Sequence, residues 1–136
     1  MDDMYRENIL DHGMNPRNKG ILDPATIDYE VTNPLCGDRL RLTLRINENN
    51  VITGIGWDGE GCAISQAAAS MLGEEILGMT VDEVKDISRD HVFDLLGIPI
   101  SQNRVKCALL GLKALHVSLH GLDYWRKQEE AAEDDE

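Results

Sequence analysis

The sequence predicts an α+β fold in which a three-stranded antiparallel sheet is packed by helices. Two observations support this prediction. Apolar and polar residues alternate in three consecutive segments between residues 27 and 57, which is the period of half-buried strands. On both sides of that region, apolar residues recur at helical spacing instead. Because the links between the strands are short, we expect an antiparallel meander with one covered face.

A short helix over residues 4–12 is the first predicted element, because apolar side chains recur there with charged residues between them. Gly13 and the turn-forming residues after it end this helix. The first strand follows, since residues 27–31 alternate between apolar and polar side chains. We expect it to end before Asn33.

The second and third strands are predicted from the clearest alternation in the chain. Apolar side chains occupy every second position of residues 40–46, with arginine or threonine between them. Residues 47–50 are polar and predict a hairpin loop. Residues 51–57 predict the third strand.

Four helices are predicted after the third strand, and the first three lie between residues 62 and 96. The first begins at Cys62, carries an apolar stripe and ends at Gly78. Thr80 and Glu83 have the spacing of a capping box, which predicts that the second helix begins there. The third is a short helix over residues 90–96, ended by a Gly-Ile-Pro segment.

The last predicted helix covers residues 105–122. Its apolar residues recur at helical spacing and leave a narrow polar stripe, so we expect this helix to be well buried. Cys107 falls in its predicted first turn. The positive end of the helix dipole would favour a thiolate there.

A length of 136 residues suits one domain with a substantial core. We expect this domain to span residues 1–122, followed by an acidic tail over residues 123–136. From Gly121 to Glu136 there are seven acidic and two basic residues, and the whole chain has a net charge of −12. A solvated, frayed end is the simplest interpretation of the tail, and a partner-binding tail is the alternative.

Composition and charge argue against several partners and compartments. Nucleic acid and anionic membrane surfaces select basic patches, which a strongly acidic chain does not favour. There is no apolar run typical of a signal peptide, and no apolar stretch approaches the roughly 20 residues that span a bilayer. We therefore expect a cytoplasmic protein with reduced thiols. An odd count of three cysteines also argues against a disulfide framework.

The three cysteines and one aspartate form the candidate functional site. Each cysteine lies where a loop should meet a regular element, and one glycine separates Cys36 from Asp38. Thiolates are soft ligands that suit zinc, copper(I) and iron–sulfur clusters, and a carboxylate can be a fourth ligand. We expect a single metal- or sulfur-handling site, with the positive charge of Lys106 beside it. Its proposed ligands are Cys36, Asp38, Cys62 and Cys107.

Other interpretations of these residues remain open at this point. Free cysteines are among the most buried residue types, so all three could be inert core residues. The four histidines are scattered and are interpreted as surface or packing residues: His12, His91, His116 and His120. A Cys–His nucleophilic enzyme would need the fold to place one of them beside a cysteine.

Around the candidate ligands the chain resembles the iron–sulfur cluster scaffold family of the IscU, SufU and NifU N-terminal type. The resemblance covers nearly the whole chain. Its most specific segments are Asn33-Pro34-Leu35-Cys36-Gly37-Asp38, Gly59-Glu60-Gly61-Cys62-Ala63-Ile64-Ser65 and Val105-Lys106-Cys107.

This resemblance implies a SufE/IscU-like α+β fold and a cargo-handling function. It implies that the residues at positions 36, 38, 62 and 107 bind zinc, iron or a transient [2Fe–2S] cluster. It also implies two kinds of partner, a cysteine desulfurase that supplies sulfur and downstream acceptors of the cluster or the sulfur.

The chain combines features of two branches of the family. Lys106 stands where the IscU branch has histidine and agrees with the SufU branch. The 45-residue separation of Cys62 and Cys107 is short, as in the IscU branch, whereas SufU proteins typically carry an insertion there. Gly97-Ile98-Pro99-Ile100-Ser101 replaces the Leu-Pro-Pro-Val-Lys motif of the IscU branch, so we do not extend binding of the Hsp70-type chaperone to this chain.

The resemblance leads to two main functional hypotheses. The first is a scaffold, rather than an enzyme, on which sulfur and iron form a cluster that is passed on. The second is a zinc-dependent sulfurtransferase partner that relays sulfur without building a cluster. The SufU branch favours Cys36 as the persulfide relay and the IscU branch favours Cys107. A purely structural zinc domain is a third hypothesis, and it requires that metal removal unfold the protein.

Overall fold

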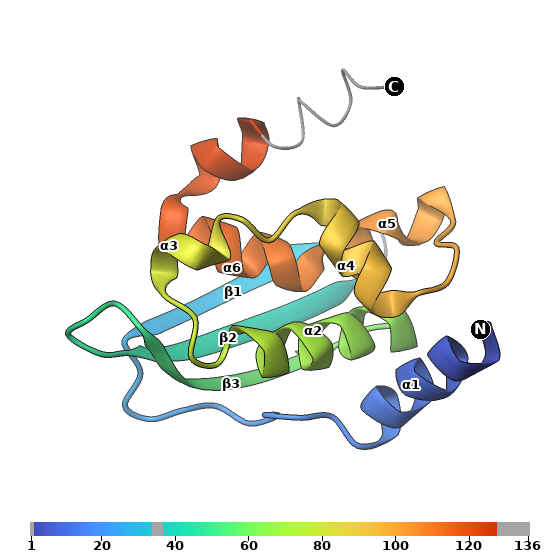
Figure 1. Ribbon diagram of the computed structural model, residues 1–136, viewed down its shortest axis with the longest axis horizontal. Coiled ribbons are helices and arrows are strands. Elements are labelled where there is room, and N and C mark those ends of the chain that lie inside the picture. The colour runs from blue at the N-terminus through green and yellow to red at the C-terminus, as the bar shows by residue number, and fades with distance from the viewer. Residues whose placement is uncertain (1, 34–36, 128–136) are drawn as a thin grey trace.

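The computed structural model describes residues 2–33 and 37–127, with side chains from Arg6 onward. Three strands, β1 (Ile27–Asn33), β2 (Asp38–Ile46) and β3 (Ile52–Glu60), form an antiparallel sheet in the order β1-β2-β3. Helices pack on one face of this sheet (Figure 1). The predicted α+β fold with a three-stranded meander is therefore confirmed.

The helices differ in how they contact the sheet. Both α2 and α6 lie directly on its covered face, while α1 and α4 pack against α2 (Figure 1). Residues 122–127 are also helical. The bounds are α1 Asp2–Met14, α2 Ala63–Ile76, α3 Val81–Val84, α4 Arg89–Leu96, α5 Gln102–Ala108 and α6 Leu110–His120.

The register of the sheet follows the alternation in the sequence. Leu42 pairs with Tyr29 on one side and Trp57 on the other, and Leu44 pairs with Ile55, so apolar residues gather on the covered face. Trp57 and Leu44 are almost fully buried in the core. The apolar side chains that alternate in the sequence therefore pair across the strands and form the part of the core that the sheet supplies.

The opposite face of the sheet is not fully open, which corrects the expectation of one covered face. Thr43 points to that face and is completely buried. Its hydroxyl donates to the Gly56 carbonyl at 2.6 Å and accepts from the Leu22 N–H at 3.0 Å. A bridge between Lys19 and Trp57 holds the preceding segment along β3. That segment carries no alternation, so the sequence pattern did not reveal it.

The structure confirms the capping signals in the second half of the chain. The Thr80 hydroxyl accepts from the Glu83 N–H at 3.1 Å, and the Glu83 carboxylate accepts from the Thr80 N–H at 3.0 Å, which completes the predicted capping box. Gly97 ends α4 in the left-handed conformation, with φ of 68°.

The predicted last helix is wrong in one respect, because two helices replace it. The chain breaks at Leu109, where φ is −94° and ψ is 0°. Residues 107–112 are all buried, on both sides of the break, and residues 67–73 of the unbroken α2 are buried as well. Burial therefore continues across Leu109 and does not mark where the first helix ends. A second interruption occurs at Gly121, with φ of 96°.

The C-terminal segment is described as far as residue 127. Trp125 is 4% exposed and belongs to the core cluster. The boundary expected after residue 122 stays a prediction, and residues 128–136 lie outside the described part. No helix within residues 2–33 and 37–127 has the length and apolar character needed to cross a bilayer.

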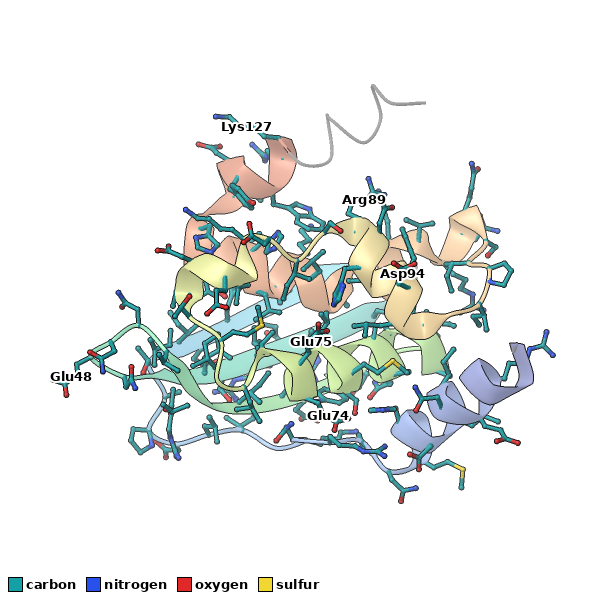
Figure 2. All side chains as sticks on the ribbon, viewed as in Figure 1. Glu48, Glu74, Glu75, Arg89, Asp94 and Lys127 are labelled. Atoms are coloured by element: carbon teal, nitrogen blue, oxygen red, sulfur yellow. The ribbon has the colours of Figure 1, made fainter. Side chains whose placement is uncertain are left out.

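The histidines mostly serve packing between helices. The Nδ1 atom of His12 lies 2.6 Å from the Ser70 hydroxyl, and the His116 Nε2 atom lies 3.1 Å from the Val84 carbonyl oxygen. Figure 2 shows Glu74 and Glu75 at opposite edges of α2, with Glu75 on the edge that faces α4. There, Glu74 approaches His12 of α1 at 3.5 Å, and Glu75 pairs with His91 of α4.

Stability is expected to fall as the pH drops from about 7.5 to 5.5. Burial lowers the pKa values of His12, His116 and His120 below the usual value near 6.5. The unfolded chain therefore binds protons at a higher pH than the folded chain, so acid favours unfolding in this range. Urea unfolding at several pH values measures the effect. A His116→Gln variant should show a shallower pH dependence, and an unchanged one would contradict this assignment.

Candidate metal centre

Three of the four candidate ligands meet at one point, although they come from different elements. Asp38 is the first residue of β2, Cys62 precedes α2, and Cys107 lies in the last turn of α5. Their ligand atoms all lie within 4.8 Å of one another. Cys36 falls in residues 34–36, outside the described part, so its membership of the site stays a prediction.

The start of β2 is fixed by a tight connection to β1. Asn33 and Asp38 are paired residues of the ladder, and the Gly37 N–H donates to the Asn33 carbonyl at 2.8 Å. Gly37 has φ of 74°, a conformation that glycine adopts without strain. Asp38 is therefore held at the end of the sheet nearest to the start of α2.

The connection from β3 to α2 is shorter than the sequence pattern suggested. The third strand was predicted over residues 51–57, but β3 continues to Glu60 and Gly59 pairs with Leu40. A side chain at Gly59 would collide with the carbonyl oxygen of Arg39, which explains a glycine inside the strand. The rigid strand thus delivers Cys62 directly to the site.

The Asp38 carboxylate has the environment of a metal ligand. Asp38 is 3% exposed, and its Oδ2 atom has no hydrogen-bond partner among the described residues. An unpaired buried carboxylate is unfavourable unless a cation satisfies it. Ligand atoms around tetrahedral zinc lie roughly 3.5–4 Å apart, so donors that all lie within 4.8 Å of one another are near enough to share one ion. The donors therefore fit a divalent ion such as zinc or iron, and a mixed sulfur–oxygen set suits both.

The Cys62 thiol is predisposed to ionise. Burial acts to raise its pKa, but the nearby N–H groups of Ser65 and Ile64 and the Arg104 side chain favour the thiolate, so the pKa is lowered overall. The Cys62 side chain makes no regular cap hydrogen bond. Its position at the N-terminus of α2 nevertheless exposes its sulfur to the positive end of that helix.

The environment of Cys107 differs from the predicted one. We placed it in the first turn of the last helix, but it lies at the end of α5, where the helix dipole does not favour a thiolate. It is also 1% exposed. The dipole argument made for Cys107 therefore applies to Cys62 instead.

Arg104 is a residue of the site that the sequence analysis missed. Its guanidinium group lies beside the Cys62 thiol, which is the main cause of its raised pKa, and the nearby charges of Cys107 and Asp38 act in the same direction. Arg104 and Lys106 are both exposed, but Arg104, and not the expected Lys106, is among the groups that lower the pKa of the Cys62 thiol. The missed signal is the spacing, since residues three apart share a helix face and Arg104 precedes Cys107 by three.

Replacing Arg104 with glutamine is expected to raise the pKa of the Cys62 thiol in the metal-free protein, because a positive charge that favours the thiolate is lost. The matched control is Lys106→Gln, which removes an exposed cation from the same helix. The pH dependence of iodoacetamide alkylation reports the pKa when Cys36 and Cys107 are both replaced by serine. Identical profiles for Arg104→Gln and its parent would refute the contact.

The fold and the donor set define a small α+β protein with a thiolate–carboxylate site suited to metal or sulfur handling. A family model described as the NifU-like N terminal domain matches residues 4–131. The chain therefore belongs to this family, as the resemblance in its sequence predicted.

Relatives in the family come from two functional groups. The chain is 36% identical over 132 residues to the zinc-dependent sulfurtransferase SufU of Bacillus subtilis, with 85% of this chain and 88% of SufU covered. It is equally identical, 36% over 125 residues, to the iron–sulfur cluster assembly scaffold protein IscU of Aquifex aeolicus, with 91% and 78% covered. Sequence identity to these two relatives does not separate scaffold from sulfurtransferase.

Solved structures share the fold. A candidate iron–sulfur cluster assembly scaffold of the SUF system from Fervidobacterium islandicum superposes with a TM-score of 0.74 at 26% identity, covering 83% of this chain and 94% of that one. The N-terminal part of a NifU-like protein from Brucella abortus gives 0.68 at 24% identity, with 95% and 96% covered, which supports the fold alone.

Proposed function

We propose that this protein is an iron–sulfur cluster assembly scaffold. It accepts persulfide sulfur from a cysteine desulfurase and holds a metal ion or a labile [2Fe–2S] cluster. The ligands are Cys36, Asp38, Cys62 and Cys107. The observation that carries this proposal is the convergence of three donors. One of them is a buried carboxylate, with an oxygen that has no hydrogen-bond partner among the described residues.

The mixed donor set suits a protein that releases its cargo to downstream acceptors. Cys62 and Cys107 supply soft sulfur donors that hold iron or zinc firmly. Asp38 supplies a hard oxygen donor, which an incoming thiolate displaces more readily from an iron–sulfur cluster. Cys62 is also partly exposed, so an acceptor protein can approach the site from that side.

Sulfur transfer to this chain is a thiol–disulfide type exchange. A cysteine thiolate attacks the terminal sulfur of the desulfurase persulfide, one S–S bond forms as the other breaks, and the desulfurase cysteine leaves as a thiolate. The terminal sulfur keeps its proton and no net oxidation occurs. We assign the relay to Cys36, with Cys107 as the alternative. The burial of Cys107 weighs against it, because a persulfide of a partner must reach the attacking sulfur.

A zinc-dependent sulfurtransferase is the second candidate function. The similarity to SufU favours it, as does the arginine beside Cys62, a candidate zinc ligand. In that case zinc supplies a positive charge that stabilises thiolates. Arg104 and the α2 N-terminus stabilise the thiolate of Cys62 in the same way.

Desulfurase assays with and without iron distinguish the two functions. A scaffold should assemble a cluster when iron, cysteine and the desulfurase are present, with the visible absorption of a [2Fe–2S] centre. A zinc relay should activate the desulfurase when it is loaded with zinc and iron is absent. Cluster formation without activation by the zinc form supports the scaffold. Activation without cluster formation would overturn it in favour of the relay.

A further inference from the structure

Position 61 requires a glycine because neighbouring atoms leave no room for a side chain, and not because of its backbone conformation. Its φ lies outside the left-handed region, so its backbone suits any residue. Gly37 is the opposite case, because its φ is 74° and nothing lies within 4 Å of a Cβ built on it. A glycine that has an ordinary conformation points to close approach by neighbouring atoms.

Two polar side chains of the site occupy the space beside Gly61. A Cβ at this position would lie 2.7 Å from Oδ1 and 2.8 Å from Cγ of Asp38, and 2.5 Å from the Ser65 Oγ atom. All three separations are far inside van der Waals contact. Both neighbours are buried, and the Ser65 hydroxyl is anchored by a 3.0 Å hydrogen bond to the Cys62 carbonyl.

We propose that Gly61 is a positioning residue that sets the place of the Asp38 carboxylate in the metal centre. The missing Cβ lets the carboxylate pack against the start of α2, next to the sulfur of Cys62. A methyl group at Gly61 would displace the carboxylate, so that only the thiolates would still bind the metal. This inference rests on the proposed function only in taking the donor group to be a metal site.

Small displacements matter because metal–oxygen distances have little tolerance. Oxygen ligands of zinc lie at about 2.0–2.2 Å, and removal of supporting contacts commonly lowers metal affinity by about 10- to 100-fold. The Oδ1 atom of Asp38 faces Gly61, and the Oδ2 atom has no partner among the described residues. Pushing Oδ1 away from Gly61 therefore moves the whole donor.

The test is a double-mutant cycle of Gly61→Ala and Asp38→Ala. Zinc affinity is measured by competition with a chromophoric chelator, and cobalt(II) spectra report the donor set. Each single variant should lose about 10- to 100-fold in affinity. The double variant should match Asp38→Ala, because Gly61 acts through that carboxylate. Losses that add, or a Gly61→Ala variant with wild-type affinity and spectrum, would overturn the proposal.

Two further variants isolate the cause. Gly111→Ala is the matched control, since its Cβ would meet Leu72 at 3.4 Å and Ala69 at 3.5 Å in ordinary contact, and it should keep zinc affinity. Ser65→Ala removes the other crowded atom. If Gly61→Ala has no effect on affinity in that background, the contact acts through the hydroxyl and the carboxylate assignment is overturned.

Unfolding of the metal-free protein separates this inference from the proposed function. A wild-type protein that binds neither metal nor cluster would refute the function, but not the contact between Gly61 and Asp38. In urea unfolding without metal, Gly61→Ala should destabilise the protein less in the Asp38→Ala background, where the carboxylate is gone. Equal destabilisation in both backgrounds would overturn the contact.

Discussion

Replacing Asp38 with cysteine is expected to lengthen the lifetime of a bound [2Fe–2S] cluster by at least about tenfold, which corresponds to roughly 1.4 kcal/mol in the barrier to release. The substitution exchanges a hard oxygen donor for a soft thiolate. The oxygen that it replaces lies within 4.8 Å of the sulfur atoms of Cys62 and Cys107. Loss of the cluster absorption after addition of an apo-acceptor protein under anaerobic conditions measures the lifetime.

A control is needed because any added thiol could bind iron. Thr53→Cys adds a thiol at an exposed position near the start of β3, whereas the site lies near its end. This variant should release its cluster as fast as the wild type. If Asp38→Cys also releases at the wild-type rate, the carboxylate is not the ligand at which exchange begins.

The sheet was predictable because side-chain alternation records which face is buried. Residues 40–46 alternate in the sequence, and the same alternation fixes the pairing of Leu42 with Tyr29 and Trp57. The ends of the strands were harder to predict. Asp38 and Gly59 belong to strands because of their pairing partners and close backbone contacts, and neither residue type favours a strand by itself.

The helix break at Leu109 leaves no mark in the sequence pattern. Residues on both sides of the break are apolar and buried, so the pattern extends across it. The consequence is local but important for the site. It moves Cys107 from the start of one helix to the end of another.

The structure brings three of the four predicted donors together, whereas the surroundings of these donors could not be predicted. Thiolates and a nearby carboxylate identify metal chemistry by residue type, and the structure brings Asp38, Cys62 and Cys107 together. Which cation and which helix end stabilise a thiolate depend on side-chain geometry. The sequence pointed to Lys106 as the neighbouring cation. The structure shows that Arg104 is the cation beside Cys62.

Removing metal is expected to leave the protein folded, which would exclude a purely structural zinc domain. The core is built from side chains of the sheet, α2 and α6, with Trp57, Leu44, Leu72 and Leu112 at most 2% exposed. A hydrophobic core of this kind does not depend on the donors, unlike that of small zinc modules, which are unfolded without metal. Bound metal should then stabilise the folded protein by mass action. The gain is about 2.7 kcal/mol when the free metal concentration is one hundred times the dissociation constant.

Thermal melting with and without a chelator measures this difference. The metal-free protein should show a cooperative transition at a lower temperature than the metal-loaded protein, with the same far-UV spectrum before melting. The variant Cys62→Ser provides the matched control, because it should melt at one temperature whether or not metal is added. A chelated wild-type protein without a cooperative transition would show that the metal holds the fold, and the site would then be structural and not built for exchange.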